Sequence, residues 1–332
     1  MRNPRWCGWL LAVFVLAAVC ALSLLVGTKA IAISDVWQAL FGASTTPDHV
    51  TVTEYRVPRT LLGLLVGLAL GVAGCLMQGL TRNPLADPGL LGVNAGAAFA
   101  ITIAVAMFGV SEITSYVWFG FLGAALVSVV VYRVGTAGRS GTDPVRLTLA
   151  GVAATAVLGG LTRGLILMHP KAFDEMRQWD SGGLTGRGFE ILYGATPFIV
   201  VGLIIAALCA RSLNAVALGD DLAHSLGVHV GRTRLFTALA VVLLCGTATA
   251  AVGPIAFVGL AVPHVARWLI GPDQRWIFAY SLVLAPILVL SADIVGRLII
   301  RPDEVPAGLV TAFLGAPVLI WLARRARVGA AA

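Results

Sequence analysis

Long apolar runs without a charged side chain fill most of this 332-residue sequence. Residues 6–28, 60–80, 88–111, 113–132, 191–210, 235–263 and 305–323 carry no charge, and residues 147–168 and 276–296 carry one charge each. A bilayer core about 30 Å thick needs about 20 apolar residues per helical crossing. Only 12% of the residues are charged, against about a quarter in soluble domains. The sequence therefore predicts an all-α, polytopic membrane protein.

The apolar stretch from residue 235 to residue 270 is too long for one straight crossing. Gly253 and Pro254 lie in its middle, and proline favours a break because it lacks a backbone donor. Two helices in this stretch bring the total to about ten crossings in one transmembrane domain that covers residues 1–332. An even number of crossings places both termini on the same side of the membrane.

The distribution of basic residues indicates which side that is. With the termini in the cytoplasm, the inner segments hold 14 of the 23 basic residues and five acids, and the outer segments hold eight basic and ten acidic residues. Cytoplasmic loops of membrane proteins are enriched in Lys and Arg. The net charge of +7 is therefore an orientation signal and does not indicate a nucleic-acid partner. The first apolar run is longer than that of a signal peptide, so we expect an uncleaved helix.

Several kinds of chemistry have no sequence signal here. The two lysines, Lys29 and Lys171, follow no Gly-rich phosphate loop, so any ATP hydrolysis must come from a partner. No HExxH or GxSxG motif occurs, which argues against a membrane enzyme. The five cysteines lie in apolar runs without paired spacing, and we expect neither a metal site nor a cofactor.

Sequence blocks along the whole chain resemble the FecCD-type family, the permeases of iron-siderophore and cobalamin ABC importers. The longest block reads YRVPRTLLGLLVGLALGVAGCLMQGLTRNPLADPGLLGVNAGAAFA from residue 55, and others are ALGDDLAHSLGV at 217–228 and GPIAFVGLAVPHVARWLIG at 253–271. The loop at 83–89, the MRQW turn at 176–179 and the HVARW block at 264–268 look most similar to ferric-enterobactin permease subunits.

The resemblance implies a function and a set of partners. The expected protein is the membrane-spanning subunit of an ATP-driven importer with the type II, cobalamin-importer-like architecture, carrying a ferric siderophore of the catecholate type across the bacterial inner membrane. The expected partners are two copies of a cytoplasmic ATPase that binds ATP and Mg, a periplasmic or lipoprotein binding protein, and a second permease subunit, identical or similar. The chain itself catalyses no bond-making.

A short polar segment joins two crossings on the inner side, at about residues 218–228. Glycine and two aspartates before a short apolar-polar pattern are typical of a capped amphipathic helix. The segment resembles the coupling helix that seats on the ATPase in this family; an ordinary polar loop is the alternative. The coupling residues expected are Gly219, Asp220, Asp221, Leu222, Ala223, His224, Ser225, Leu226 and Gly227.

Three arginines stand on the outer side, where the topology rule disfavours them. Arg56 and Arg59 flank Pro58 at the start of one crossing, and Arg297 ends another. They match family positions whose arginines meet acidic residues of the binding protein, so we expect them to dock that partner. The alternative is that they anchor helix ends by snorkelling.

Two charged residues fall within apolar crossings. Arg163 lies five residues before the outer end of its run, and it either faces an anionic chelate in the translocation path or snorkels to the surface. Asp293 stands four residues before Arg297, which favours an intrahelical ion pair. Glycine repeats at 63–74 and 151–164 predict close helix packing.

Other functions stay open at this stage. Within the same family, cobalamin or haem is the alternative cargo. An ion-coupled secondary transporter or a structural membrane scaffold is the alternative class, and neither would co-purify with an ATPase.

Overall fold

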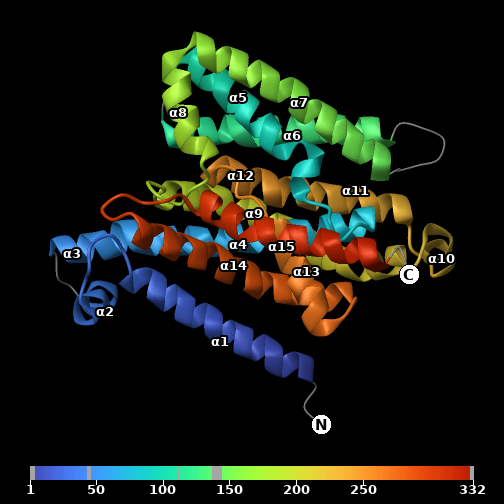
Figure 1. The fold of residues 1–332 in the computed structure, drawn as a ribbon, viewed down its shortest axis with the longest axis horizontal. Coiled ribbons are helices and arrows are strands. Elements are labelled where there is room, and N and C mark those ends of the chain that lie inside the picture. Colours follow the sequence, from blue (N-terminus) through green and yellow to red (C-terminus); the bar gives the residue numbers. More distant parts are fainter. Residues whose placement is uncertain (1–3, 43–45, 111, 137–143, 330–332) are drawn as a thin grey trace.

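The computed structural model describes residues 4–42, 46–110, 112–136 and 144–329, and every regular element in these ranges is a helix (Figure 1). Seven helices are long and apolar enough to cross a membrane, and three shorter apolar helices complete the expected ten. The long ones are α1 (Pro4–Leu25), α4 (Val57–Thr81), α6 (Ile113–Thr136), α7 (Pro144–Met168), α9 (Phe189–Ala217), the run of α11 (Val230–Val241), η3 (Val242–Gly246) and α12 (Thr247–Val252), and α14 (Gln274–Ile299). The shorter ones are α5 (Val93–Phe108), α13 (Val258–Ile270) and α15 (Ala307–Gly329). The all-α, polytopic fold predicted from the sequence is confirmed.

The two ends of the bundle carry different elements. Both chain termini lie at the end that holds the short helix α10 (Asp220–Ser225) (Figure 1). The opposite end holds α2 (Ile33–Phe41), α3 (Pro47–Val50) with η1 (Thr51–Arg56), and α8 (Pro170–Asp180). This arrangement is the one that an even number of crossings requires. Below, the first end is called the α10 end and the second the outer end. Arg2 and Arg139, which contribute to the inner charge, lie outside the described residues.

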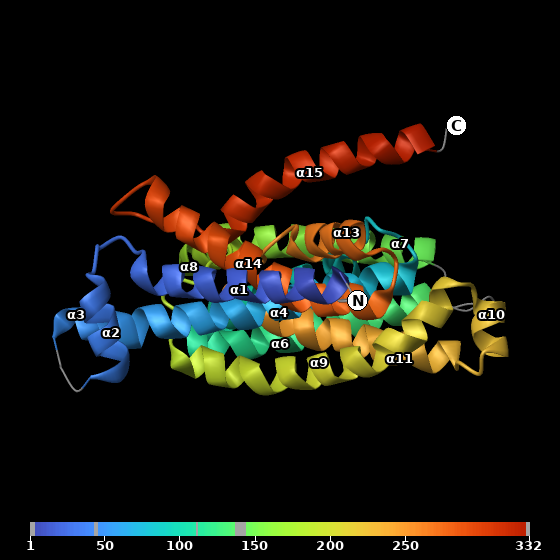
Figure 2. The same ribbon diagram turned by 90° about the horizontal axis from the view of Figure 1, so that it is seen from below.

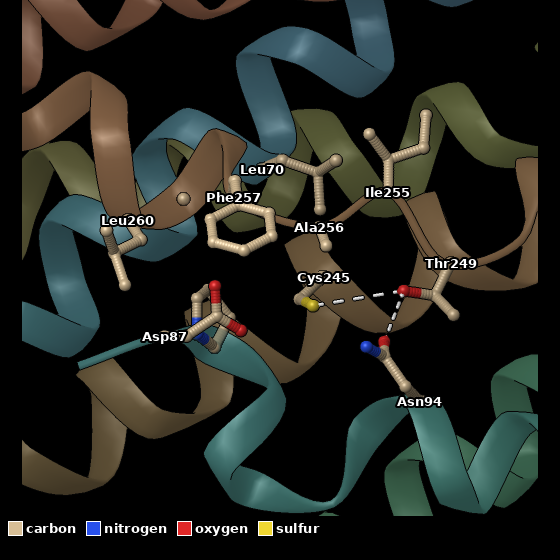
Figure 3. Close-up of a pocket in the computed structure, with 11 residues that line it drawn as sticks. Leu70, Asp87, Asn94, Cys245, Thr249, Ile255, Ala256, Phe257 and Leu260 are labelled. Carbon is tan, nitrogen blue, oxygen red and sulfur yellow. Dashed lines mark hydrogen bonds between the residues drawn. The ribbon is translucent and has the colours of Figure 1, made fainter. Parts of the chain in front are cut away.

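The predicted break at Gly253-Pro254 is present. Helix α12 ends at Val252 and α13 begins at Val258, and Gly253 and Phe257 both have positive φ angles, of 80° and 67°. The unwound segment and the turn η2 (Pro88–Leu91) border a cavity of about 190 Å³ (Figure 3). Asp87 and Asn94 also line the cavity, and Thr249 donates a hydrogen bond of 2.9 Å to Asn94 Oδ1.

Helix α4 lies in the middle of the bundle and packs closely through its glycines. A Cβ at Gly63 would press on Leu290, one at Gly67 on the backbone of Pro286, and one at Gly74 would overlap the carbonyl oxygen of Gly259. The glycine repeat at 63–74 thus serves close helix packing, as expected. The second repeat differs along its length, because a Cβ at Gly151 would overlap Leu90 whereas the C-terminal glycines of α7 have no neighbour within 4 Å. These are Gly159, Gly160 and Gly164.

Two glycines make a matched pair for testing this packing. Replacing Gly74 by alanine pushes a methyl group into the backbone of α13, and we expect a loss of stability of about 1–3 kcal/mol. In Gly160→Ala the new methyl group meets no neighbour, and alanine favours the helix more than glycine does. The stability should therefore be unchanged or rise by less than about 1 kcal/mol. Thermal unfolding of the purified chain in detergent measures both, and equal effects would contradict the packing described for α4.

Candidate functional site

The expected coupling segment forms a short helix at the α10 end. Gly219 precedes it with a φ of 116°, a conformation that residues with a Cβ rarely adopt. Ala223 is fully buried and belongs to a small cluster with Val216 and Val230. The larger apolar side chains of the segment, Leu218, Leu222 and Leu226, are instead 48–63% exposed. One small face therefore seats the helix, and its leucines project away from the bundle.

Asp220 holds this helix to two other elements. Its carboxylate pairs with Arg82, which follows the last turn of α4 with a φ of 52°, and with Arg234 of α11 at 2.9 Å. The sequence suggested a capped helix, but the N-cap residue is Gly219, which has no side chain that could cap it. The two aspartates stand in the first turn instead. Negative charge in the first turn is still favourable. Arg82 and Arg234 were not among the predicted site residues, because their pairing depends on where the helices lie.

Arg56 lies at the outer end and points into the subunit. Only 5% of its surface is exposed. Its guanidinium donates hydrogen bonds to the carbonyl oxygens of Leu24 and Leu25 at 2.7 and 2.8 Å, and to that of Lys29 at 2.6 Å. The last carbonyl groups of a helix have no partner within the helix. Arg56 therefore caps the C-terminus of α1.

Arg297 performs the same task from α14. It is 1% exposed and donates to the carbonyl oxygens of Ser23 and Val26 at 2.8 and 2.9 Å. It also pairs with Asp293, with a distance of 3.0 Å from Nε to Oδ2. The intrahelical ion pair expected between Asp293 and Arg297 is confirmed.

Arg59 joins the same group of charges. Its Nη2 lies 2.7 Å from Asp293 Oδ1, and its Nη1 lies 2.8 Å from Glu304 Oε2. We call Arg59, Asp293, Arg297 and Glu304 the outer charge cluster. The structure thus brings together Arg59 and Arg297 through one carboxylate, with Arg56 beside them. In this conformation all three arginines serve contacts within the subunit, and Arg59 and Glu304 are the most exposed members of the cluster. Docking of a binding protein to these arginines stays a prediction.

Arg163 stands apart from both groups. It is exposed on α7, four residues from Gly159 and next to Gly164, on a helix whose side chains are little buried by the rest of the chain. Its positive charge acts on Asp180 at the end of α8. Burial raises the pKa of Asp180, and the positive charge of Arg163 partly offsets that rise.

The fold and the two ends define a class of protein: a polytopic membrane subunit that exposes a short, ion-paired helix at the end holding its termini. The chain belongs to the FecCD transport family, whose model matches residues 15–325.

Known proteins of this class are similar along nearly the whole chain. The ferric enterobactin transport system permease protein FepD of Escherichia coli K12 is 50% identical over 94% of this chain and 93% of its own. The siderophore transport system permease protein YfiZ of Bacillus subtilis 168 is 39% identical over 97% of both. A solved structure of an inward-facing metal-chelate type ABC transporter has a TM-score of 0.82 and 25% identity, and covers 97% of this chain and 100% of that one. Permeases of this kind are transport subunits and not enzymes.

Asp293 is the residue on which the outer charge cluster depends. Asp293→Asn leaves the buried Arg297 and the half-buried Arg59 without their shared anion, and we expect a loss of about 3–5 kcal/mol of stability. Glu304→Gln is the matched control, because Glu304 is ten times more exposed, at 20% against 2%, and its removal should cost about 1 kcal/mol or less. Thermal unfolding in detergent distinguishes them; an Asp293→Asn protein as stable as Glu304→Gln would refute the assignment.

Proposed function

We propose that this chain is the permease subunit of an ABC importer that carries a ferric siderophore of the catecholate type across the bacterial inner membrane. The observation that carries the proposal is the 50% identity, over nearly the full length of both chains, to a permease named for ferric enterobactin. The exposed leucines in and beside α10, Leu218, Leu222 and Leu226, support the presence of a partner subunit, since they need one to cover them. ATP hydrolysis is the task of a separate cytoplasmic subunit.

The α10 helix is our candidate for the contact with that ATPase. Leu222 and Leu226 offer apolar contacts, while Asp220 ties the helix to α4 and α11. A push on a short helix held in this way reaches two transmembrane helices at once, which is how a rigid-body switch transmits motion. The segment from Gly219 to Gly227 is therefore the proposed coupling element.

The coupling role can be tested by changing only exposed side chains. Asp221→Arg combined with Leu222→Glu reverses a charge and removes an apolar contact, and we expect ATP-driven uptake to fall at least about tenfold, equivalent to about 1.4 kcal/mol of lost coupling. Co-purification with the ATPase should weaken in parallel.

A matched control makes the same two kinds of change at the outer end. Asp35→Arg with Leu40→Glu in α2 should leave co-purification of the ATPase unchanged. Wild-type uptake and ATPase stimulation in the α10 variant would rule out the coupling role.

A second permease subunit is proposed to cover α7 and α15. Helix α15 diverges from the bundle (Figure 2), and Phe313 on it is 85% exposed. The uncovered glycines of α7 permit close approach of another helix. Arg163 shares this helix, so a path between two subunits would pass a positive charge, which suits an anionic ferric catecholate. The partner is either a second copy or a similar chain.

The outer end is the proposed docking side for a substrate-binding protein. Exposed charge pairs contribute about 0–1 kcal/mol each, so docking needs several of them per subunit. Arg59 and Glu304 lie nearest the surface among the clustered charges, and an acidic group of a partner would compete with Glu304 for Arg59. Such a contact orients the partner and raises the rate of association.

Uptake by the reassembled importer tests energy source and cargo together. Liposomes containing this chain, its ATPase and its binding protein should accumulate ferric catecholate only when ATP is present on the side of the membrane that holds the ATPase. Ferric hydroxamate, haem and cobalamin should compete weakly for this uptake. Arg163→Leu should lower the uptake rate while protein levels stay normal. Uptake driven by an ion gradient without the ATPase would indicate a secondary transporter, and stronger competition by haem or cobalamin would change the cargo.

A further inference from the structure

A groove of about 560 Å³ runs between α1, α13 and α14. Its walls come from Leu11 and Val15 of α1 and Leu269 of α13, and its floor from Leu284 and Ile287 of α14. Arg5 closes it at the α10 end, where Tyr280 donates a hydrogen bond of 2.8 Å to the Arg5 carbonyl oxygen. The groove is thus apolar along its length and polar at one end.

The length of the groove matches half a bilayer. From Arg5 to Val15 the helix rises about 15 Å, at 1.5 Å per residue. The hydrocarbon core of a bilayer is about 30 Å thick, so one leaflet is about 15 Å. A chain lying in this groove with its polar end at Arg5 therefore ends near the middle of the membrane.

Two arginines stand at the polar end without an acidic partner. Trp6 and Trp276 pack edge to face at 4.9 Å between ring centroids, which places the residues before them, Arg5 and Arg275, at the same end. Both arginines are exposed, and neither forms an ion pair within the described ranges. Trp9 is anchored nearby, donating to the carbonyl oxygen of Ala279 at 3.0 Å. Arginines beside a group of tryptophans are typical of the membrane–water interface.

The face of α1 that points away from the bundle indicates that lipid, not another subunit, surrounds this helix. Its exposed side chains include large apolar ones, Leu10 at 60%, Leu11 at 64% and Phe14 at 73%, beside exposed alanines at 17, 18 and 21. Interfaces between membrane helices are instead enriched in small residues. Helix α7 has three uncovered glycines, whereas the one glycine of α1, Gly8, faces Tyr280 within the subunit. A second permease subunit therefore fits α7, and the membrane fits α1.

We propose that the groove binds one anionic phospholipid from the leaflet at the α10 end, with its phosphate between Arg5 and Arg275 and an acyl chain along Leu11, Val15 and Leu284. Basic groups near a membrane surface attract anionic lipid with about 1 kcal/mol each. The bound lipid fills the space between α1 and the α13–α14 pair, which the protein's own side chains leave open.

Native mass spectrometry of the assembled full-length importer tests this with two lipids of identical acyl chains. After delipidation, the first phosphatidylglycerol should bind on the order of tenfold more tightly than the first phosphatidylethanolamine. Arg5→Gln with Arg275→Gln should remove most of that preference and leave phosphatidylethanolamine binding unchanged. The control Arg301→Gln changes an exposed arginine just after the end of α14, far along that helix from Arg275, and should keep the wild-type preference.

A second variant tests the groove itself. Ala12→Phe places a ring in the groove and should lower retention of both lipids, because the space for the acyl chain is lost. Equal binding of the two lipids by the wild type, or an unchanged preference in the double arginine variant, would overturn the proposal. So would an Ala12→Phe chain that binds lipid normally but no longer associates with a second permease subunit, since the groove would then be a protein interface.

Discussion

Asp293 is a carboxylate inside an apolar bundle, and the outer half of the structure is organised around it. A buried charge is costly unless it is paired and hydrogen-bonded, and Asp293 meets both Arg59 of α4 and Arg297 of α14. Arg297 then uses its remaining donors on the carbonyl groups at the end of α1, where Arg56 supplies the others. One carboxylate thereby fixes three helices relative to one another. This also explains why arginines stand on the side where they are disfavoured: their charges and donors are satisfied within the subunit.

A carboxylate that bridges two arginines also occurs at the α10 end, where it is more exposed to solvent. There Asp220 also bridges two arginines, Arg82 and Arg234, and Arg82 follows the last turn of α4, the helix that carries Arg59 near its start. Asp220 is 40% exposed, whereas Asp293 is 2% exposed. Breaking a buried pair costs about 3–5 kcal/mol, but an exposed pair contributes only about 0–1 kcal/mol. The central helix is therefore held firmly at the outer end and weakly at the α10 end, which is the end proposed to move with the ATPase.

The sequence predicted the fold well because its strongest signals are local. Apolar runs of the right length gave the crossings, and Gly253-Pro254 gave the break, since each depends only on neighbouring residues. The partners of the site residues could not be predicted in this way. Arg56 contacts carbonyl groups about 30 residues earlier in the chain, and Asp220 pairs with Arg82, 138 residues away. An arginine at a helix end has the same local pattern whether it docks a partner, snorkels, or caps another helix, and only the packing distinguishes these roles.

The helices at the surface of the subunit differ in whether their glycines are covered. Close packing of α4 depends on glycines that let α13 and α14 approach, so the core has no room to rearrange without separating helices. Helix α7 carries three glycines that no residue of this subunit covers, which permit the same kind of contact, whereas the one glycine of α1 already packs on Tyr280. A closely packed core thus stands between one face suited to a subunit and another suited to lipid, and α7, α15 and α10 are among the elements that the rest of the subunit covers little. These are the elements nearest the proposed pathway and the proposed ATPase contact.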